Sequence, residues 1–174
     1  MRTWQWLVVS LGVAALPGLP PEAQEKRMHP TAVVAMAKGG EIRIELFPDD
    51  APKTVESFIA LSKKGFYNGL AFHRVVPGFV AQGGDPKGDG TGGPGYTLKA
   101  EFNKRKHVRG TVAMARSQHP DSAGSQFYIC FASAPHLDGN YTVFGQVVNG
   151  MEVVDQIKVG DTMKTVRIEE PPKP

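Results

Sequence analysis

The sequence predicts a mainly β domain, built as a sandwich or barrel of about eight strands with two helices. Its 20 glycines and 14 prolines indicate many turns and short elements. Between these turn residues lie short runs in which apolar residues alternate with polar ones or follow one another directly, as in strands. Only two stretches have the apolar spacing of a helix. A length of 174 residues suggests one domain.

The first two strands are expected to form a hairpin. The segment TAVVAMAKGGEIRIELFP, residues 31–48, contains two strand-like runs on either side of Lys38, Gly39 and Gly40. In the second run, residues 41–46, polar and apolar residues alternate, which is the period of a half-buried strand. The glycine pair supplies the backbone freedom that a tight hairpin turn needs.

A helix is expected next, within residues 49–67. Its apolar face would consist of Val55, Phe58, Ile59, Ala60 and Leu61. Asp49 or Asp50 could cap the start of this helix, and Pro52 suits its first turn. Gly65, which follows two lysines, is a good position for the helix to end.

The remaining elements are mostly short strands. The predicted strand runs are AFHRVV (71–76), GFVAQGG (78–84), GTVAMAR (110–116), SQFYICFA (125–132) and TVFGQVV (142–148). A glycine-rich loop, residues 83–102, lies among them. A short second helix fits residues 150–158, and a last strand fits residues 164–170.

The chain begins with the features of an export signal. Arg2 precedes a short apolar run, WLVVSLGVAAL, at positions 6–16. This run is shorter than the roughly 20 residues that span a bilayer, and residues 13–15, Val-Ala-Ala, offer a cleavage site. We therefore interpret residues 1–30 as a signal peptide and flexible leader, and expect an exported protein, periplasmic or secreted, without stable membrane insertion after processing. The alternative is a protein that an uncleaved segment tethers to a membrane.

Charge and cysteine content argue against several classes of protein. The formal net charge of +3 provides no dense basic patch, so nucleic-acid binding is not expected. Cys130 is the single cysteine, so the chain cannot form an internal disulfide. Its apolar neighbours indicate a small buried core residue, because a catalytic cysteine needs a group that stabilises its thiolate.

Several local motifs suggest other functions but lack the context that those functions need. GDGTGG, residues 88–93, matches a phosphate-binding pattern, but no helix is expected to follow it. DPKGDG, residues 85–90, lacks the later glutamate of a calcium loop. His119 and Asp121 have no partners at metal-ligand spacing, and Ser125 lacks the sequence around a hydrolase nucleophile. The sequence therefore predicts no metal site and no nucleophilic site.

A set of ordered motifs resembles the cyclophilin family of peptidyl-prolyl cis-trans isomerases. The motifs are FHRVVPGFVAQGGDP (72–86), GTGG (90–93), GTVAMAR (110–116), GSQFYI (124–129) and LDGNYTVFGQVVNGMEVVD (137–155). The similarity extends from about Ala32 to Glu170. It implies a domain at residues 31–171, with 172–174 as a disordered tail, and a closed eight-stranded antiparallel barrel capped by two helices. It also implies an enzyme that needs no cofactor, acts on proline-containing polypeptides and assists the folding of exported proteins; we expect a monomer.

The implied reaction is rotation about an Xaa-Pro bond, for which no nucleophile or base is needed. Amide resonance opposes this rotation with a barrier of about 20 kcal/mol. In the twisted transition state the resonance is lost, and the prolyl nitrogen gains a lone pair that can accept a hydrogen bond. A donor aimed at this nitrogen binds the transition state better than the planar ground states. Arginine suits this task because its donors are permanently charged.

The resemblance assigns roles to individual residues. It implies that Arg74 is the donor and that Gln82 orients Arg74 and contacts the peptide backbone. The implied pocket for the proline ring consists of Phe79, Val80, Tyr128 and Leu137. The other implied peptide-binding positions are Ala115, Arg116, Gln126 and Tyr141.

Some positions depart from the common family pattern. Val80 stands where methionine is common, Tyr128 where phenylalanine is common, and Arg116 where asparagine is common. His136 stands where many members carry the tryptophan whose indole N–H binds the inhibitor cyclosporin. The resemblance therefore implies only weak cyclosporin binding, and it leaves substrate preference open.

Two other functions compete with an isomerase. A proline-peptide binding module or holdase would keep the apolar pocket and could lose Arg74 without losing affinity. A secreted hydrolase has almost no support, because no nucleophile–base pair is visible in the sequence.

Overall fold

The computed structural model describes residues 29–171. Nearly all of the predicted signal and leader segment, and the predicted tail at 172–174, lie outside the described residues. The described elements are, in chain order, β1 (Thr31–Met36), β2 (Glu41–Leu46), α1 (Pro52–Lys63), β3 (Arg74–Val76), β4 (Val80–Gly83), β5 (Thr111–Met114), the 3-10 turn η1 (Pro120–Ser122), β6 (Phe127–Cys130), the 3-10 turn η2 (Pro135–Leu137), β7 (Val143–Asn149), α2 (Met151–Val154) and β8 (Met163–Glu169). None of the helices in this range has the length and apolar character needed to cross a membrane.

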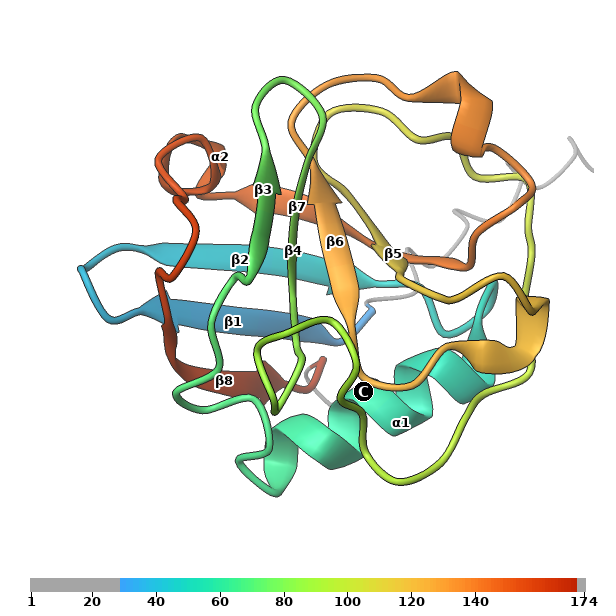
Figure 1. Ribbon diagram of the computed structural model, residues 1–174, viewed down its shortest axis with the longest axis horizontal. Coiled ribbons are helices and arrows are strands. Elements are labelled where there is room, and N and C mark those ends of the chain that lie inside the picture. The colour runs from blue at the N-terminus through green and yellow to red at the C-terminus, as the bar shows by residue number, and fades with distance from the viewer. Residues whose placement is uncertain (1–28, 172–174) are drawn as a thin grey trace, which may run out of the picture.

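The described strands form one antiparallel sheet in the order β3-β4-β6-β5-β7-β2-β1-β8. The sheet curls into a half-barrel, with α1 below it and α2 at the upper left in Figure 1. The prediction of a mainly β fold with eight strands and two helices is therefore confirmed.

The expectation of a closed barrel is wrong, because the sheet is open between its edge strands β3 and β8. Within residues 29–171 these two strands share no ladder, and the edges approach each other through an isolated bridge between Ala71 and Thr162. Asn68, which follows α1, accepts a hydrogen bond from the N–H of Val166 at 3.0 Å. The segment after α1 thus takes up part of the outer edge of β8, where a closed barrel would place β3.

The β1–β2 hairpin forms as the sequence predicts. Gly39 and Gly40 have φ angles of +99° and +87°, which residues other than glycine rarely adopt. The N–H of Met36 donates to the carbonyl of Gly40 at 3.0 Å and closes the turn. A Cβ on Gly40 would also lie 2.8 Å from a methyl group of Val153 in α2, so this position requires glycine for both reasons.

Helix α1 is present as predicted, but its N-terminal cap is not. Ala51 is the N-cap residue and makes no side-chain cap hydrogen bond, so neither Asp49 nor Asp50 caps the helix. A distant residue replaces them: the carboxylate of Glu101 accepts hydrogen bonds from two backbone N–H groups of the first turn, at 3.0 and 2.8 Å. Gly65, with φ +72°, follows the last helical turn as predicted.

The sheet separates two apolar clusters, and the smaller one underlies the site. The main core includes the buried rings of Phe58, Tyr67, Phe72, Phe127 and Phe144. The smaller cluster includes Val80, Tyr128 and Cys130. Because successive strand residues face opposite sides, Phe127 enters the main core and Tyr128 the smaller cluster, as the sequence predicts. Cys130 is also buried, and burial raises the pKa of its thiol to about 12.

Candidate active site

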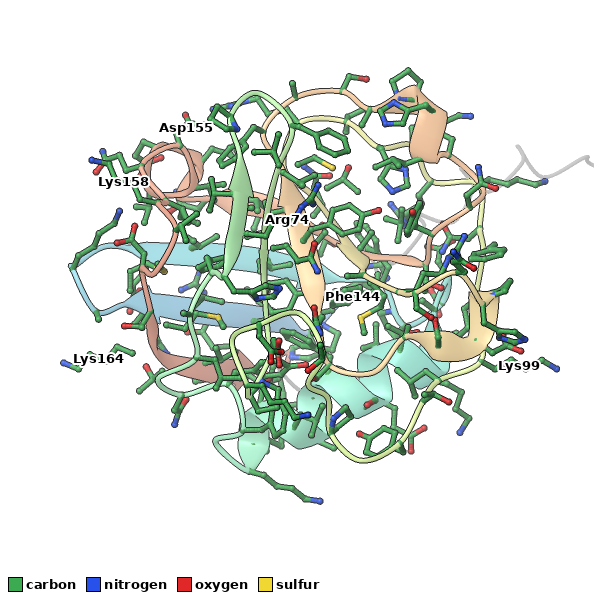
Figure 2. All side chains as sticks on the ribbon, in the orientation of Figure 1. Arg74, Lys99, Phe144, Asp155, Lys158 and Lys164 are labelled. Carbon is green, nitrogen blue, oxygen red and sulfur yellow. The ribbon has the colours of Figure 1, made fainter. Side chains whose placement is uncertain are left out.

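Arg74 and Gln82 are brought together by the β3–β4 hairpin. The strand register pairs these two residues directly across the ladder. A terminal guanidinium nitrogen of Arg74 donates to Oε1 of Gln82 at 3.4 Å. Arg74 is exposed, and Figure 2 shows it near the centre of the view, whereas Lys99 and Lys164 project outward at the periphery. The hairpin therefore presents a permanent cation whose orientation is set by a neighbouring amide.

The amide of Gln82 belongs to a longer line of hydrogen bonds. Its Nε2 donates to Oε1 of Gln126 at 3.0 Å. Nε2 of Gln126 donates in turn to the backbone carbonyls of Gly90 at 3.0 Å and Gly92 at 2.9 Å. The glycine-rich loop is thus connected to Arg74 through two glutamine side chains.

Beside Arg74 lies an apolar pocket with a volume of about 230 Å³. Its lining residues are Arg74, Phe79, Val80, Gln82, Ala115, Arg116, Tyr128, Leu137 and Tyr141. These are all of the predicted site residues except Gln126, so segments far apart in the sequence meet here. The pocket is large enough for a pyrrolidine ring, and its walls are mainly apolar and aromatic.

A buried histidine anchors one wall of this pocket. His107 is 1% exposed, and its Nε2 lies 3.0 Å from the hydroxyl of Tyr128. Its Nδ1 lies 3.0 Å from Oδ1 of Asp138. Since a carboxylate only accepts, Nδ1 carries the proton and donates to Asp138, while Nε2 accepts from the Tyr128 hydroxyl. The pocket wall is thereby fixed to Asp138, the neighbour of the lining residue Leu137.

Burial and hydrogen bonding determine the protonation states of His107, Asp138 and Tyr128. Desolvation lowers the pKa of His107, although Asp138 opposes this effect. The imidazole is therefore neutral at physiological pH, despite its carboxylate neighbour. The backbone N–H of His107, its imidazole and Lys106 lower the pKa of Asp138 to about 2. Burial raises the pKa of the Tyr128 phenol, so this hydroxyl stays protonated and available as a donor.

The rim of the pocket is aromatic. The rings of Phe79 and His136 stack with centroids 5.5 Å apart. Tyr141 meets Tyr128 edge to face at 5.8 Å. The guanidinium carbon of Arg116 lies 4.7 Å from the Tyr141 ring centroid. Because these rings contact one another, the entrance to the pocket has a defined shape.

Arg116 is held by neutral groups. Its guanidinium donates to the carbonyls of Asn140, Ser117 and Gln118 at distances between 2.9 and 3.1 Å. These contacts join the segment after β5 to the segment before β7. The Arg116 side chain therefore has a structural role in addition to lining the pocket.

A second, larger cavity of about 380 Å³ adjoins the apolar pocket. The two share Gln82, Ala115 and Arg116. Gln126 lines this second cavity together with the glycine-rich loop. The structure thus places the predicted residue Gln126 beside the proline-sized pocket rather than in it.

The residues in the rejected motifs have ordinary structural partners. Ser125 is buried, and its hydroxyl donates to the carbonyl of Gly84 at 2.7 Å. Oδ1 of Asp85 accepts from the N–H of Lys87 at 2.8 Å, within its own loop. In the part of the chain that the structure describes, no three histidine, cysteine or acidic side chains are grouped as a metal site would need.

Sequence reasoning missed His107, Asp138 and the role of Asp85 in the loop. His107 and Asp138 lie in different segments, and nothing in their sequence spacing indicates that they meet. The tyrosine at position 128 was a usable signal, because a buried phenol requires a hydrogen-bond partner. Asp85 follows two glycines, which is compatible with an acceptor for loop N–H groups.

The fold and the site together define a class of protein. A curled antiparallel sheet with an apolar pocket and an arginine beside it fits the class that the resemblance implies, a cyclophilin-type peptidyl-prolyl isomerase. The chain belongs to the cyclophilin family, since the model of the family described as "Cyclophilin type peptidyl-prolyl cis-trans isomerase/CLD" matches residues 31–173. This membership establishes the enzyme class.

Similar proteins are also named peptidyl-prolyl cis-trans isomerases. A peptidyl-prolyl cis-trans isomerase of Helicobacter pylori is 49% identical over 150 residues, which cover 83% of this chain and 91% of the relative. Peptidyl-prolyl cis-trans isomerase B of Bacillus subtilis is 49% identical over 141 residues, covering 80% and 98%. A Cryptosporidium parvum cyclophilin type isomerase, crystallised in the presence of the dipeptide Ala-Pro, has a TM-score of 0.75 and 32% identity, covering 81% of this chain and 99% of that chain.

Proposed function

We propose that this protein accelerates rotation about Xaa-Pro bonds in exported polypeptides, with Arg74 as the donor to the prolyl nitrogen. The observation that carries this proposal is the position of Arg74. Its guanidinium lines the apolar pocket and is oriented by Gln82 at 3.4 Å. The crystallisation of the Cryptosporidium parvum relative in the presence of Ala-Pro supports proline-containing peptides as ligands.

The pocket and the Arg74 cation have separate roles in this mechanism. The walls formed by Phe79, Tyr128 and Leu137 hold the proline ring, so the preceding part of the peptide rotates against a fixed ring. As the amide twists, its nitrogen acquires a lone pair, and the permanently charged guanidinium donates to it. The interaction is stronger in the transition state than in either planar state, which is the condition for catalysis.

A protease-coupled assay on a short Xaa-Pro peptide tests this function directly. The protein should accelerate the slow cis-to-trans phase in proportion to its concentration. A binding module or holdase would bind the peptide and leave the slow phase unchanged. The monomeric state also remains a prediction, and light scattering after size-exclusion chromatography tests it.

We further propose that residues 1–30 are an export signal and leader, so that the protein acts in the periplasm or outside the cell. The support is the basic start followed by a short apolar run in the sequence. A membrane tether is the alternative outcome. Cell fractionation of the full-length gene product distinguishes these locations.

Processing should remove both tryptophans of the chain, Trp4 and Trp6. The exported protein is then expected to show tyrosine-dominated fluorescence, because tyrosine becomes its principal emitter. Its mass should lack at least residues 1–15. Mass spectrometry of the purified exported fraction checks this, and a full-length mass in that fraction would favour a tether instead.

Cyclosporin is expected to inhibit this enzyme weakly. His136 stands at the rim, stacked on Phe79 at 5.5 Å, where the resemblance implies a drug-binding tryptophan in many members. An imidazole covers less apolar surface than an indole, and its donor has a different reach. Losing one hydrogen bond and part of an aromatic contact costs about 2–3 kcal/mol, which is roughly a 30–150-fold loss of affinity. His136→Trp should therefore raise cyclosporin sensitivity with little change in kcat/KM.

An inhibition titration of both forms measures this difference. His136→Ala is the control, since it also alters the rim but supplies no indole, and its sensitivity should not rise. Tight inhibition of the unmodified enzyme would show that the rim residue does not determine drug affinity.

A further inference from the structure

The direction of the two glutamine amides is determined by the glycine-rich loop. The carbonyls of Gly90 and Gly92 can only accept, so the NH2 group of Gln126 must face them. Its Oε1 must then face Gln82, at 3.0 Å from Nε2 of that residue. Gln82 in turn presents its own Oε1 to Arg74. Each amide fixes the direction of the next, and the guanidinium meets an acceptor as a result.

The loop that begins this line is itself held in one conformation. Asp85 is 1% exposed and accepts from the N–H of Lys87 at 2.8 Å and that of Gly90 at 2.5 Å. Burial favours a raised pKa, but these donors hold the pKa of Asp85 below its ordinary value. A Cβ on Gly92 would collide with Oδ1 of Asp85, so only glycine fits against this carboxylate. The two carbonyls that orient Gln126 therefore have fixed positions.

We propose that Gln126 is a positioning residue that acts on Arg74 through Gln82, and that it is not a donor to the bound peptide. Two carbonyls of the loop already occupy its NH2 group. Its remaining acceptor faces Gln82, so no donor of Gln126 is directed at the apolar pocket, which it does not line. This proposal rests on the function proposed above, because orienting the Arg74 guanidinium matters only if Arg74 donates to the prolyl nitrogen in the transition state.

Gln126→Glu provides a test in which pH controls whether the hydrogen bonds can run from the loop carbonyls through position 126 and Gln82 to Arg74. When the introduced carboxyl group is ionised, it has no donor for the Gly90 and Gly92 carbonyls, so the amide line is disrupted. When it is protonated, it can donate its O–H to the loop and accept from Gln82, which restores the original direction. We expect kcat to be about tenfold below that of the unmodified protein at pH 8, which is part of the roughly 100-fold that a misplacement of about 1 Å can cost. The deficit should shrink to about threefold or less near pH 4.5, where an ordinary glutamate carboxyl group is partly protonated.

Other charged groups near this position must be separated from the effect. Arg74 and Arg116 line the adjoining pocket, and Asp85 and His73 interact electrostatically near the loop. The measured quantity is therefore the ratio of variant to unmodified enzyme at each pH. Two-dimensional NMR exchange spectroscopy on an Ala-Pro peptide, at several peptide concentrations, gives kcat and KM across this pH range without a coupling protease.

Two further variants separate positioning from peptide binding and from general structure. In a Gln82→Ala background, Gln126→Glu should cause no further loss of kcat, because the line passes through Gln82. Gln156→Glu, at an exposed position, is the matched control and should give a ratio near one at every pH. A ratio for Gln126→Glu that does not change with pH, a loss confined to KM, or a loss that persists without Gln82 overturns the proposal. The proposed function fails separately, if Arg74→Ala retains normal turnover.

Discussion

Replacing Arg74 with alanine is expected to lower kcat/KM about 100-fold or more, the scale for removing one transition-state donor. Peptide affinity should change much less, because a planar amide nitrogen is a poor acceptor and the pocket walls remain. Arg74→Lys should also be a poor enzyme, since an ammonium group lacks the guanidinium geometry that meets both Gln82 and the peptide. The protease-coupled assay and a separate binding titration measure the two effects.

Arg167→Ala is the matched control for this prediction. Arg167 is also an exposed arginine, but it pairs with Glu41 at 3.0 Å, between β8 and β2, and neither residue lines the pocket. Its loss should leave kcat/KM within about twofold, because surface ion pairs contribute little. Near-normal turnover of Arg74→Ala, with the control unaffected, would instead favour the proline-peptide binding module.

The mechanism proposed for this site needs no titrating catalyst. Its reaction breaks no covalent bond, so it needs a shaped pocket and a donor rather than a base. The tyrosine and histidine beneath the pocket serve to fix its wall, since Tyr128 donates to a neutral His107. In the proposed mechanism the catalytic group is the always-charged Arg74, and the groups beneath the pocket do not change protonation near neutral pH.

Local patterns in the sequence predicted most of the fold. The alternation at residues 41–46 predicted β2, and the glycine pair before it predicted the hairpin. The opposite orientations of Phe127 and Tyr128 also followed from strand period alone. Such features depend on neighbours in the chain, so a single sequence contains the information needed to predict them.

Features that depend on distant residues were not predictable from these patterns. Glu101 caps α1 in place of the nearby aspartates, and only the fold brings it there. The open edge depends on Asn68 meeting β8, which no periodicity indicates. The predicted site residues came from the family resemblance, because the apolar ones among them cannot be distinguished from core by pattern alone. Their placement around one pocket required the three-dimensional arrangement.

Phe127 is a core residue whose loss should greatly reduce stability. Its ring is fully buried and packs against three others, Phe58 at 5.6 Å, Tyr67 at 5.8 Å and Phe72 at 6.3 Å between centroids. These rings come from α1 and from the segments that follow it, whereas Phe127 belongs to β6. Several elements therefore converge on one side chain, and none can move into its space without disturbing the others.

Phe127→Ala is accordingly expected to lower the free energy of unfolding by about 3–5 kcal/mol, through lost apolar burial and the cavity left behind. That is a large part of the roughly 5–15 kcal/mol that stabilises a typical domain. Urea titration followed by circular dichroism measures the change. Phe102→Ala is the control, because Phe102 is 42% exposed, and its loss should cost well under half as much. Equal losses in the two variants would mean that the aromatic cluster does not dominate the core.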